Sequence, residues 1–171
     1  MTDLLLDRLD SPLGEILIVS DGEALRALDY AGYETRMHAL LRKRCGDVRL
    51  RYAADPGGAS SRLRAYFAGD LRATEALAVE TGGTPFQQDV WSELRRIAPG
   101  STLTYGELAV RLGRGPAASR AVGLANSLNP VAIVVPCHRV IGANAGLTGY
   151  AGGLDKKAWL LRHEGAQLAL L

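Results

Sequence analysis

Residues 81–85, TGGTP, place two glycines and a proline within five positions, and such a cluster interrupts regular secondary structure. Before it, short apolar segments alternate with turn sequences, whereas after it apolar residues recur at helical spacing. A chain of 171 residues can bury the core of one compact unit or of two small ones. The sequence therefore predicts an α+β protein with an N-terminal domain over residues 1–83 and a mainly helical C-terminal domain over residues 84–171.

The N-terminal part has the pattern of a small antiparallel sheet. Its apolar segments LLLDRL, GEILIV and EALRALD are separated by the turn-rich SPLG and SDGE. The segment ETRMHALLRKR then carries Met37, Leu40 and Leu41 at helical spacing, so its basic residues indicate a solvated face and helix end. A second helix at SRLRAYFAG and a short strand at LAVE complete the predicted domain.

The C-terminal part opens with a strong helix signal, because Thr84 can cap a helix that begins with Pro85. One apolar stripe follows this helix: Phe86, Val90, Trp91, Leu94 and Ile97. Two more helices, YGELAVRL and AASRAVGLAN, are joined by the turn-forming GRGP, which is a helix-turn-helix pattern. An ordinary helical hairpin has the same periodicity, so both readings stay open at this point.

Composition excludes several classes of protein. No apolar stretch approaches the ~20 residues that span a bilayer, and the N-terminus MTDLLLDRLD lacks the features of a secretory signal, so we expect a cytoplasmic protein. The two cysteines form no CxxC or zinc-like spacing. Net charge is +2, but residues 1–83 hold 11 Lys and Arg against 13 Asp and Glu, whereas residues 84–171 hold 9 against 5. This asymmetry weakly favours an anionic partner for the C-terminal part.

The sequence IVVPCHRVI, residues 133–141, places one thiol at the end of an apolar run. A cysteine after VAIVV is usually a small buried hydrophobic residue. His138 and Arg139 follow Cys137, however, and a cation and an imidazole beside a thiol favour the nucleophilic thiolate. Side chains adjacent in an extended chain point apart, so His138 would reach Cys137 only through a water molecule or a third group.

The motif VPCHRV is preceded by Asn129-Pro130 and followed by LTGYAGGLDKKAWLLRHEG. These motifs, in this order and spacing, closely resemble the O6-alkylguanine-DNA alkyltransferases, from about Thr84 to Gly165. The N-terminal part matches only in length and in its strand-and-helix outline, which is usual for the variable, ribonuclease H-like domain of this family.

The resemblance implies that the helix-turn-helix enters the minor groove of double-stranded DNA that contains an alkylated guanine. Arg120, on the second helix, matches the arginine that takes the place of the damaged base, which rotates into a pocket beside the thiol. The DNA-binding residues implied are Ser119, Arg120, Ala121, Tyr105 and Arg139. The resemblance implies a monomer without a membrane partner, and the basic C-terminal part would supply affinity for phosphates.

The resemblance also implies the chemistry. Cys137 attacks the alkyl carbon in one displacement, Tyr105 donates a hydrogen bond to the base, and Glu164 orients His138 in a relay through water to the thiol. The residues that form or support the pocket are Asn129, Val140, Gly149, Tyr150, Ala151 and Gly152. Ala151 stands where some members carry a hydroxyl, so a backbone N–H must serve there. No cofactor is needed, and with only Cys45 and His38 as soft ligands the first domain should hold no zinc.

Two other functions remain open from the residues. A Cys-His hydrolase would also use Cys137 and His138, but it would turn over many substrates and needs no helix-turn-helix. A DNA-binding module without chemistry would need no cysteine. Trp91 and Trp159 are expected in the core.

Overall fold

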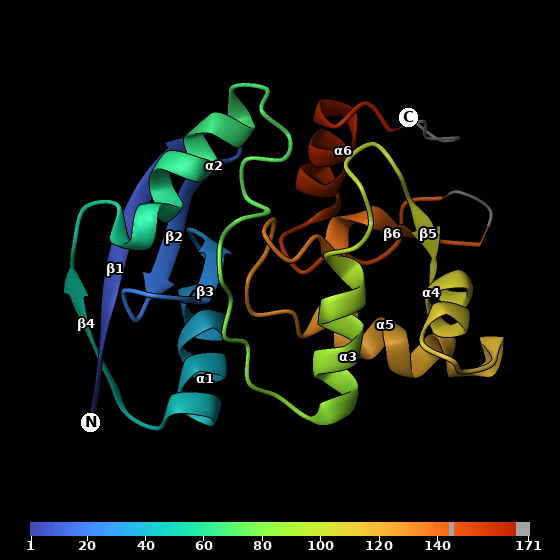
Figure 1. Ribbon diagram of the computed structural model, residues 1–171, viewed down its shortest axis with the longest axis horizontal. Coiled ribbons are helices and arrows are strands. Elements are labelled where there is room, and N and C mark those ends of the chain that lie inside the picture. Colours follow the sequence, from blue (N-terminus) through green and yellow to red (C-terminus); the bar gives the residue numbers. More distant parts are fainter. Residues whose placement is uncertain (144–145, 167–171) are drawn as a thin grey trace. The chain divides into compact units, whose positions relative to one another are not determined.

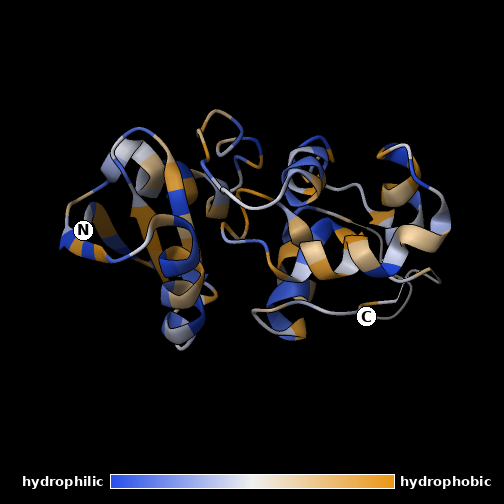
Figure 2. Ribbon diagram, turned by 90° about the horizontal axis from the view of Figure 1, so that it is seen from below, coloured by the Kyte–Doolittle hydropathy of each residue, from blue (hydrophilic) through white to orange (hydrophobic). Residues whose placement is uncertain are grey.

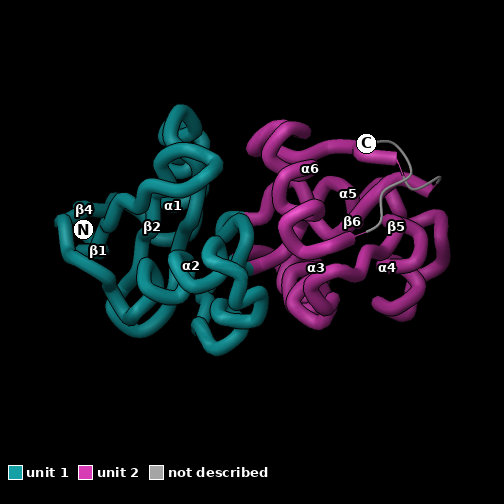
Figure 3. Tube along the Cα trace, turned by 90° about the horizontal axis from the view of Figure 1, so that it is seen from above, with its two compact units in different colours: residues 1–82, 130–134 teal, residues 83–129, 135–171 magenta. Residues whose placement is uncertain are grey.

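The computed structural model describes residues 1–143 and 146–166 and divides into two compact units. Unit 1 comprises residues 1–82 and 130–134, and unit 2 comprises residues 83–129 and 135–171 (Figure 3). The chain passes from one unit to the other within the TGGTP segment. It later returns to unit 1 for the five residues just before the Cys137 segment, which the sequence did not indicate.

A four-stranded sheet with the order β3-β2-β1-β4 forms unit 1 (Figure 1). β1 (Thr2–Ser11) pairs antiparallel with β2 (Gly14–Ser20), and β2 pairs antiparallel with β3 (Leu25–Tyr30). These antiparallel strands confirm the prediction from LLLDRL, GEILIV and EALRALD. The sequence did not reveal β4 (Val48–Tyr52), which pairs in parallel with β1.

Side chains on both faces of this sheet are buried. Along β2, Ile16 and Ile18 alternate with Leu17 and Val19, and all four are at most 1% exposed. Because successive side chains of a strand point to opposite faces, both faces of β2 are covered. α1 (Glu34–Cys45) contributes Met37 and Leu41 to one core cluster: Leu4, Leu17, Val19, Ala27, Met37 and Leu41. α2 (Ala59–Phe67) follows the short 3₁₀ helix η1 (Pro56–Gly58) and contacts β1.

Two extended segments form isolated parallel bridges with β3. Leu25 pairs with Val79, so the predicted strand at LAVE is reduced to a single bridge. Leu28 pairs with Val131, and the backbone hydrogen bonds from Leu28 N to Pro130 O and from Ala132 N to Leu28 O fix that register. These bonds anchor residues 130–132 to the sheet of unit 1.

Unit 2 begins with α3 (Pro85–Leu94), and its start confirms the predicted cap. Thr84 accepts from the backbone N–H of Gln87, and the Gln87 side chain accepts from the N–H of Thr84, which is a complete capping box. The helix ends at Leu94, three residues before the end of the apolar stripe. Trp91 is buried, as expected, and its indole donates to the carbonyl of Ala125 at 2.9 Å.

The helix-turn-helix pattern is present as two short helices in contact. α4 (Tyr105–Arg111) is capped by Thr104 and leads through η2 (Pro116–Ala118) to α5 (Ser119–Ser127). β5 (Leu103–Thr104), directly before α4, pairs in parallel with β6 (Val140–Ile141), directly after η3 (Cys137–Arg139). This pairing brings the start of α4 to the Cys137 segment.

The last described helix is α6 (Leu154–His163), whose buried face carries Leu160 and Leu161. Trp159 on this helix is only half-buried and stacks on His163 with 4.7 Å between the ring centroids, so its prediction as a core residue was wrong. Hydrophobic and hydrophilic residues both occur on the helices of the two units (Figure 2). In the described part of the chain, no helix combines the length and the apolar character needed to cross a membrane.

Candidate active site

Cys137 lies in a buried segment that two asparagines hold in place. The Cys137 N–H donates to the carbonyl of Val135 at 2.8 Å, across Pro136 with φ −83° and ψ 65°, which is a tight three-residue turn. The side chain of Asn129 donates to the Val135 carbonyl at 2.8 Å, and that of Asn126 donates to the Cys137 carbonyl at 3.3 Å. Both asparagines come from the end of α5 and the turn after it. The structure thus ties Asn129 to the segment before Cys137, and it adds Asn126, which the sequence analysis did not name.

Glu164 brings His138 and Arg139 together around one buried carboxylate. Its Oε2 lies 2.9 Å from His138 Nε2 and 2.8 Å from Arg139 Nη2, and its Oε1 accepts from Arg139 Nε at 2.8 Å. Glu164 follows the last residue of α6, and the left-handed Gly165, with φ 77°, then turns the chain away. The structure therefore joins Glu164 to His138, 26 residues apart in sequence.

The Glu164 carboxylate stays ionised and determines which nitrogen of His138 carries the proton. Burial alone would raise the pKa of Glu164, but the hydrogen bonds from Arg139 and the neighbouring His138 outweigh it and hold that pKa far below its usual range. Burial lowers the pKa of His138 despite the opposing charge of Glu164, so its neutral form is favoured. Because a carboxylate only accepts hydrogen bonds, the neutral imidazole carries its proton on Nε2, and its Nδ1 is an acceptor.

Arg139 was predicted to bind DNA, and its geometry corrects that assignment. The residue is 7% exposed. Besides its two hydrogen bonds to Glu164, its Nη1 donates to the carbonyl of Ile97 at 2.6 Å. A guanidinium directed at a buried carboxylate and a buried carbonyl has no free fork to present to a phosphate.

Tyr105, the first residue of α4, lies beside the GYAGG loop. Its hydroxyl donates to the carbonyl of Thr148 at 3.5 Å, and a Cβ on Gly149, whose φ is 42°, would lie 3.8 Å from that hydroxyl oxygen. Burial raises the pKa of Tyr105, so the phenol keeps its proton and can donate it. The structure thus brings Tyr105 to the predicted wall of the pocket.

Other predicted pocket residues differ in their exposure. Val140 and Gly152 are buried, Tyr150 is half-buried, and Gly149 and Ala151 are exposed. Gly149 and Ala151 are therefore the positions in this loop that are open to solvent, and the Ala151 side chain carries no polar atom.

Lys157 is a second residue that the sequence analysis missed. It is fully buried, and its ammonium donates to the carbonyls of Val140 at 2.6 Å, Thr148 at 2.5 Å and Gly149 at 3.3 Å. Burial lowers its pKa to about 8. Its spacing in the sequence indicates burial, because Lys157 stands three and four positions before Leu160 and Leu161 and therefore lies on the apolar face of α6. Lys157 ties the GYAGG loop to the strand that follows Cys137.

The second helix of the helix-turn-helix presents Arg120 to solvent. Arg120 and Ala121 are exposed, while Ser119 is half-buried and donates to the Pro116 carbonyl at 2.5 Å. Within residues 1–143 and 146–166, the Arg120 guanidinium has no hydrogen bond or ion pair. Leu124, one turn further along, is 63% exposed. This face of α5 is therefore available to a partner.

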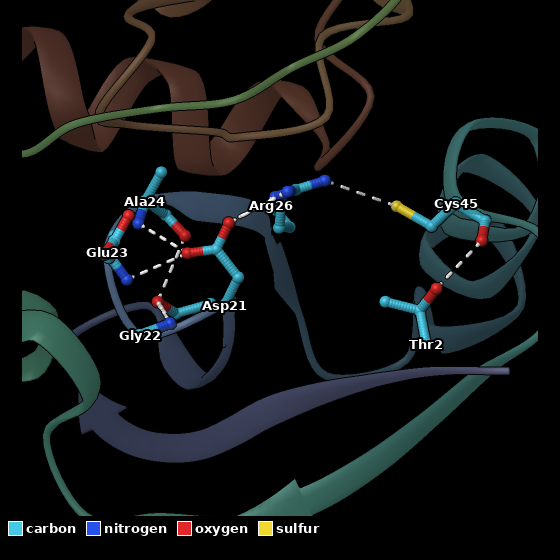
Figure 4. A network of polar contacts seen from close by, with 8 residues as sticks. Thr2, Asp21, Gly22, Glu23, Ala24, Arg26 and Cys45 are labelled. Carbon is cyan, nitrogen blue, oxygen red and sulfur yellow. Dashed lines mark hydrogen bonds and ion pairs between the residues drawn. The ribbon is translucent and has the colours of Figure 1, made fainter.

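The other thiol, Cys45, belongs to unit 1 and has a different setting (Figure 4). Its Sγ lies 3.7 Å from Arg26 Nη1, and the same guanidinium pairs with Asp21 at 2.9 Å. Among the described residues, no group of three or more His, Cys, Asp and Glu side chains is arranged to hold a metal ion.

Comparisons with known proteins agree over most of the chain, including both units. The family model for the 6-O-methylguanine DNA methyltransferase ribonuclease-like domain matches residues 5–81, and the model for the DNA-binding domain of the same protein matches residues 85–166. A methylated-DNA–protein-cysteine methyltransferase of Salmonella typhimurium is 51% identical, over 96% of this chain and 98% of the relative. One of Methanosarcina acetivorans is 48% identical over 92% and 96%.

A solved structure of a relative is similar to this chain over both units. The crystal structure of Mycobacterium tuberculosis OGT in complex with DNA superposes with a TM-score of 0.79 and 38% identity, covering 96% of this chain and 93% of that one. The match includes both units, so the N-terminal likeness is stronger than its sequence pattern suggested. This chain therefore belongs to the O6-alkylguanine-DNA alkyltransferase family, in which the relatives that it matches are named methylated-DNA–protein-cysteine methyltransferases.

Proposed function

We propose that this protein repairs double-stranded DNA by transferring the alkyl group of O6-alkylguanine to Cys137, once per molecule. The observation that carries the proposal is the buried arrangement of Cys137, His138 and Glu164 in a chain whose relatives carry the methyltransferase name. A second support is the exposed face of α5 in the part of the chain that matches the DNA-binding domain.

The first step forms the thiolate. A water molecule between Cys137 and His138 accepts the thiol proton and passes one of its own to His138 Nδ1. The two residues lie in the 3₁₀ helix η3 rather than in extended chain, and successive side chains of a 3₁₀ helix point about 120° apart, so a bridging water is still needed. His138 then carries a proton on each nitrogen, and Glu164 stabilises the cation through Nε2. Arg139 holds the carboxylate in position for this task, which replaces its predicted contact with DNA.

The second step moves the alkyl group. The Cys137 sulfur forms a bond to the alkyl carbon as the bond from that carbon to guanine O6 breaks. Guanine anion is a poor leaving group, so Tyr105 donates its phenolic proton to the base. The proton that His138 took up in the first step then returns through solvent to the Tyr105 phenolate. The products are a thioether and restored guanine, and the number of protons is conserved.

The pocket must also hold the base. Lys157 fixes the carbonyls of Thr148 and Gly149 at the start of the GYAGG loop, residues 149–153, and backbone N–H groups at Ala151 and Gly152 would donate to O6. Val140 and Tyr150 contribute further pocket wall, and Asn129 supports the Cys137 segment from α5.

Access to the base requires that it leave the duplex. O6 of a stacked guanine is beyond the reach of a buried thiol, and extrusion costs a few kcal/mol, least for a weakened pair. We propose that α5 binds the minor groove, that Arg120 fills the space of the rotated base, and that Ser119 and Ala121 contact the backbone beside it. The protein would act as a monomer in the cytoplasm, without a cofactor.

Intact-protein mass spectrometry after incubation with a duplex containing O6-methylguanine tests this function. We expect one methyl group on the wild type and on Cys45→Ser, and none on Cys137→Ser, which should still bind the duplex. Repeated turnover with unmodified Cys137 would support a hydrolase instead. Binding without any gain in mass by the wild type would indicate a DNA-binding module.

A further inference from the structure

Two buried polar atoms, each on a residue that adjoins Cys137, lack hydrogen-bond partners among the described residues: Asn126 Oδ1 and His138 Nδ1. Asn126 is 5% exposed and His138 is fully buried. Both residues adjoin Cys137, because His138 follows it in the chain and Asn126 donates through Nδ2 to its carbonyl at 3.3 Å. A buried polar atom without a partner is costly, so two of them on residues that adjoin Cys137 call for an explanation.

Both atoms are acceptors. The Asn126 carboxamide has its NH2 group on the Cys137 carbonyl, which leaves its oxygen on the other side. The Glu164 carboxylate holds the proton of neutral His138 on Nε2, which leaves a lone pair on Nδ1. The Cys137 thiol has one proton and can satisfy one acceptor. A single water molecule has two protons for both acceptors and a lone pair for the thiol.

We propose that Asn126 is a positioning residue for thiolate formation: its Nδ2 holds the Cys137 carbonyl, and its Oδ1 binds and orients the water through which the thiol proton reaches His138. The inference rests on the proposed function and adds to it the residue that orients the water. Asn126 belongs to α5, which also carries Arg120, so the helix that faces DNA supports the nucleophile directly.

The orientation of the water follows from its bonds. With one O–H donated to Asn126 Oδ1, the other O–H points to His138 Nδ1, and a lone pair remains for the thiol proton. The proton then moves from sulfur to the water oxygen while the water proton on the His138 side moves to Nδ1. Among the described residues, the titratable and charged groups that face Cys137 or its relay include Tyr105 on α4, Arg139 on η3, and Lys157 and Glu164 at α6. A substitution at Asn126 leaves each of these side chains in place.

The test is Asn126→Leu, which keeps the approximate volume but removes both polar groups. In a Cys45→Ser background, thiolate absorbance against pH reports Cys137 alone, and the single-turnover rate is measured with free O6-benzylguanine to avoid any effect of DNA binding. We expect the apparent pKa of the Cys137 thiol to rise, and the rate to fall about tenfold at pH 7, as the loss of one hydrogen bond in the relay would give. The ratio of the variant rate to the wild-type rate should recover above the thiol pKa.

Ser127→Ala is the matched control, because Ser127 neighbours Asn126 on the exposed side of α5 and bonds only locally, to the Leu124 carbonyl. It should leave the thiol titration and the rate unchanged. A rate loss in Asn126→Leu that is equal at every pH, with an unshifted thiol pKa, would show that Asn126 is merely structural.

A high-resolution crystal structure of the wild type keeps the inference testable if Asn126→Leu does not fold. We expect a water molecule within hydrogen-bond distance of both Asn126 Oδ1 and His138 Nδ1, and its absence would overturn the inference. Failure of the proposed function is recognised separately, because the wild type and Ser127→Ala would then transfer no alkyl group at all.

Discussion

Replacing Glu164 by glutamine should destabilise the protein as well as slow alkyl transfer. The carboxylate accepts hydrogen bonds from Arg139 and His138, and its side chain is fully buried. Glutamine keeps the shape of the side chain but has only one acceptor oxygen. Its NH2 group replaces the other oxygen and must face an N–H donor of Arg139 or His138. The substitution also leaves the guanidinium of Arg139, whose side chain is 8% exposed, without its counter-charge.

Removing one partner of a buried ion pair costs about 3–5 kcal/mol. Both charged groups are shielded from solvent, so this value needs no large reduction for screening. For a protein of this size, 1 kcal/mol shifts Tm by ~2–4 °C, which predicts a fall in Tm of roughly 6–20 °C. Surface Glu75, 49% exposed and paired with Arg72 at 2.8 Å, is the control, since Glu75→Gln should change Tm by less than about 3 °C.

The assay is thermal unfolding of wild type, Glu164→Gln and Glu75→Gln as a function of pH. The folded-state pKa of Glu164 is lowered, so its stabilisation is complete above the unfolded-state pKa of about 4.3 and is lost as pH falls below it. The difference in Tm between wild type and Glu164→Gln should therefore shrink below about pH 4. Equal Tm values for these two proteins at pH 7 would refute the described buried ion pair.

Three further predictions concern alkyl transfer. Arg120→Ala should react at least about tenfold more slowly with duplex DNA but nearly normally with free alkylated base, because only the duplex requires extrusion; equal losses on both substrates would contradict a role in flipping. Lys157→Met should slow transfer to both substrates at least about tenfold, because three backbone carbonyls lose the ammonium that donates to them. Any change in the wild-type rate near pH 8 that comes from titration of Lys157 should be absent in this variant. An unchanged rate would contradict the role of Lys157 in holding the loop. Tyr105→Phe should lower the single-turnover rate on duplex about 10²-fold while Cys137 still titrates normally, and a full wild-type rate would exclude the phenol as proton donor.

Local signals explain which parts of the fold could be predicted. The cap at Thr84 and the helix-turn-helix depend on residues close together in sequence, and both are present. β4 escaped prediction because its exposed residues include Arg49, Arg51 and Tyr52, which resemble a loop. Its partner β1 lies more than 40 residues away, and a parallel pairing of this kind leaves no local turn signal.

The site shows the same limit. Cys137 and His138 could be chosen from the residues themselves, because a thiol is followed by an imidazole and a cation, whereas Glu164 could be chosen only because it matches a motif of the family. Arg139 was misassigned because sequence adjacency to a reactive cysteine does not reveal burial, and its partners Ile97 and Glu164 come from distant segments. Asn126 and Lys157 look like ordinary helical polar residues, and only the tertiary structure shows that each bonds to the backbone around the thiol.

The central claim is that Cys137 accepts one alkyl group and does not release it. The most direct test titrates a fixed amount of protein with an excess of duplex O6-methylguanine and measures restored guanine together with the site of methylation by peptide mass spectrometry. We predict a plateau at one guanine per protein molecule, with the methyl group on Cys137 and none on Cys45. Continued repair beyond one equivalent, or methylation elsewhere with Cys137 unmodified, would contradict the account.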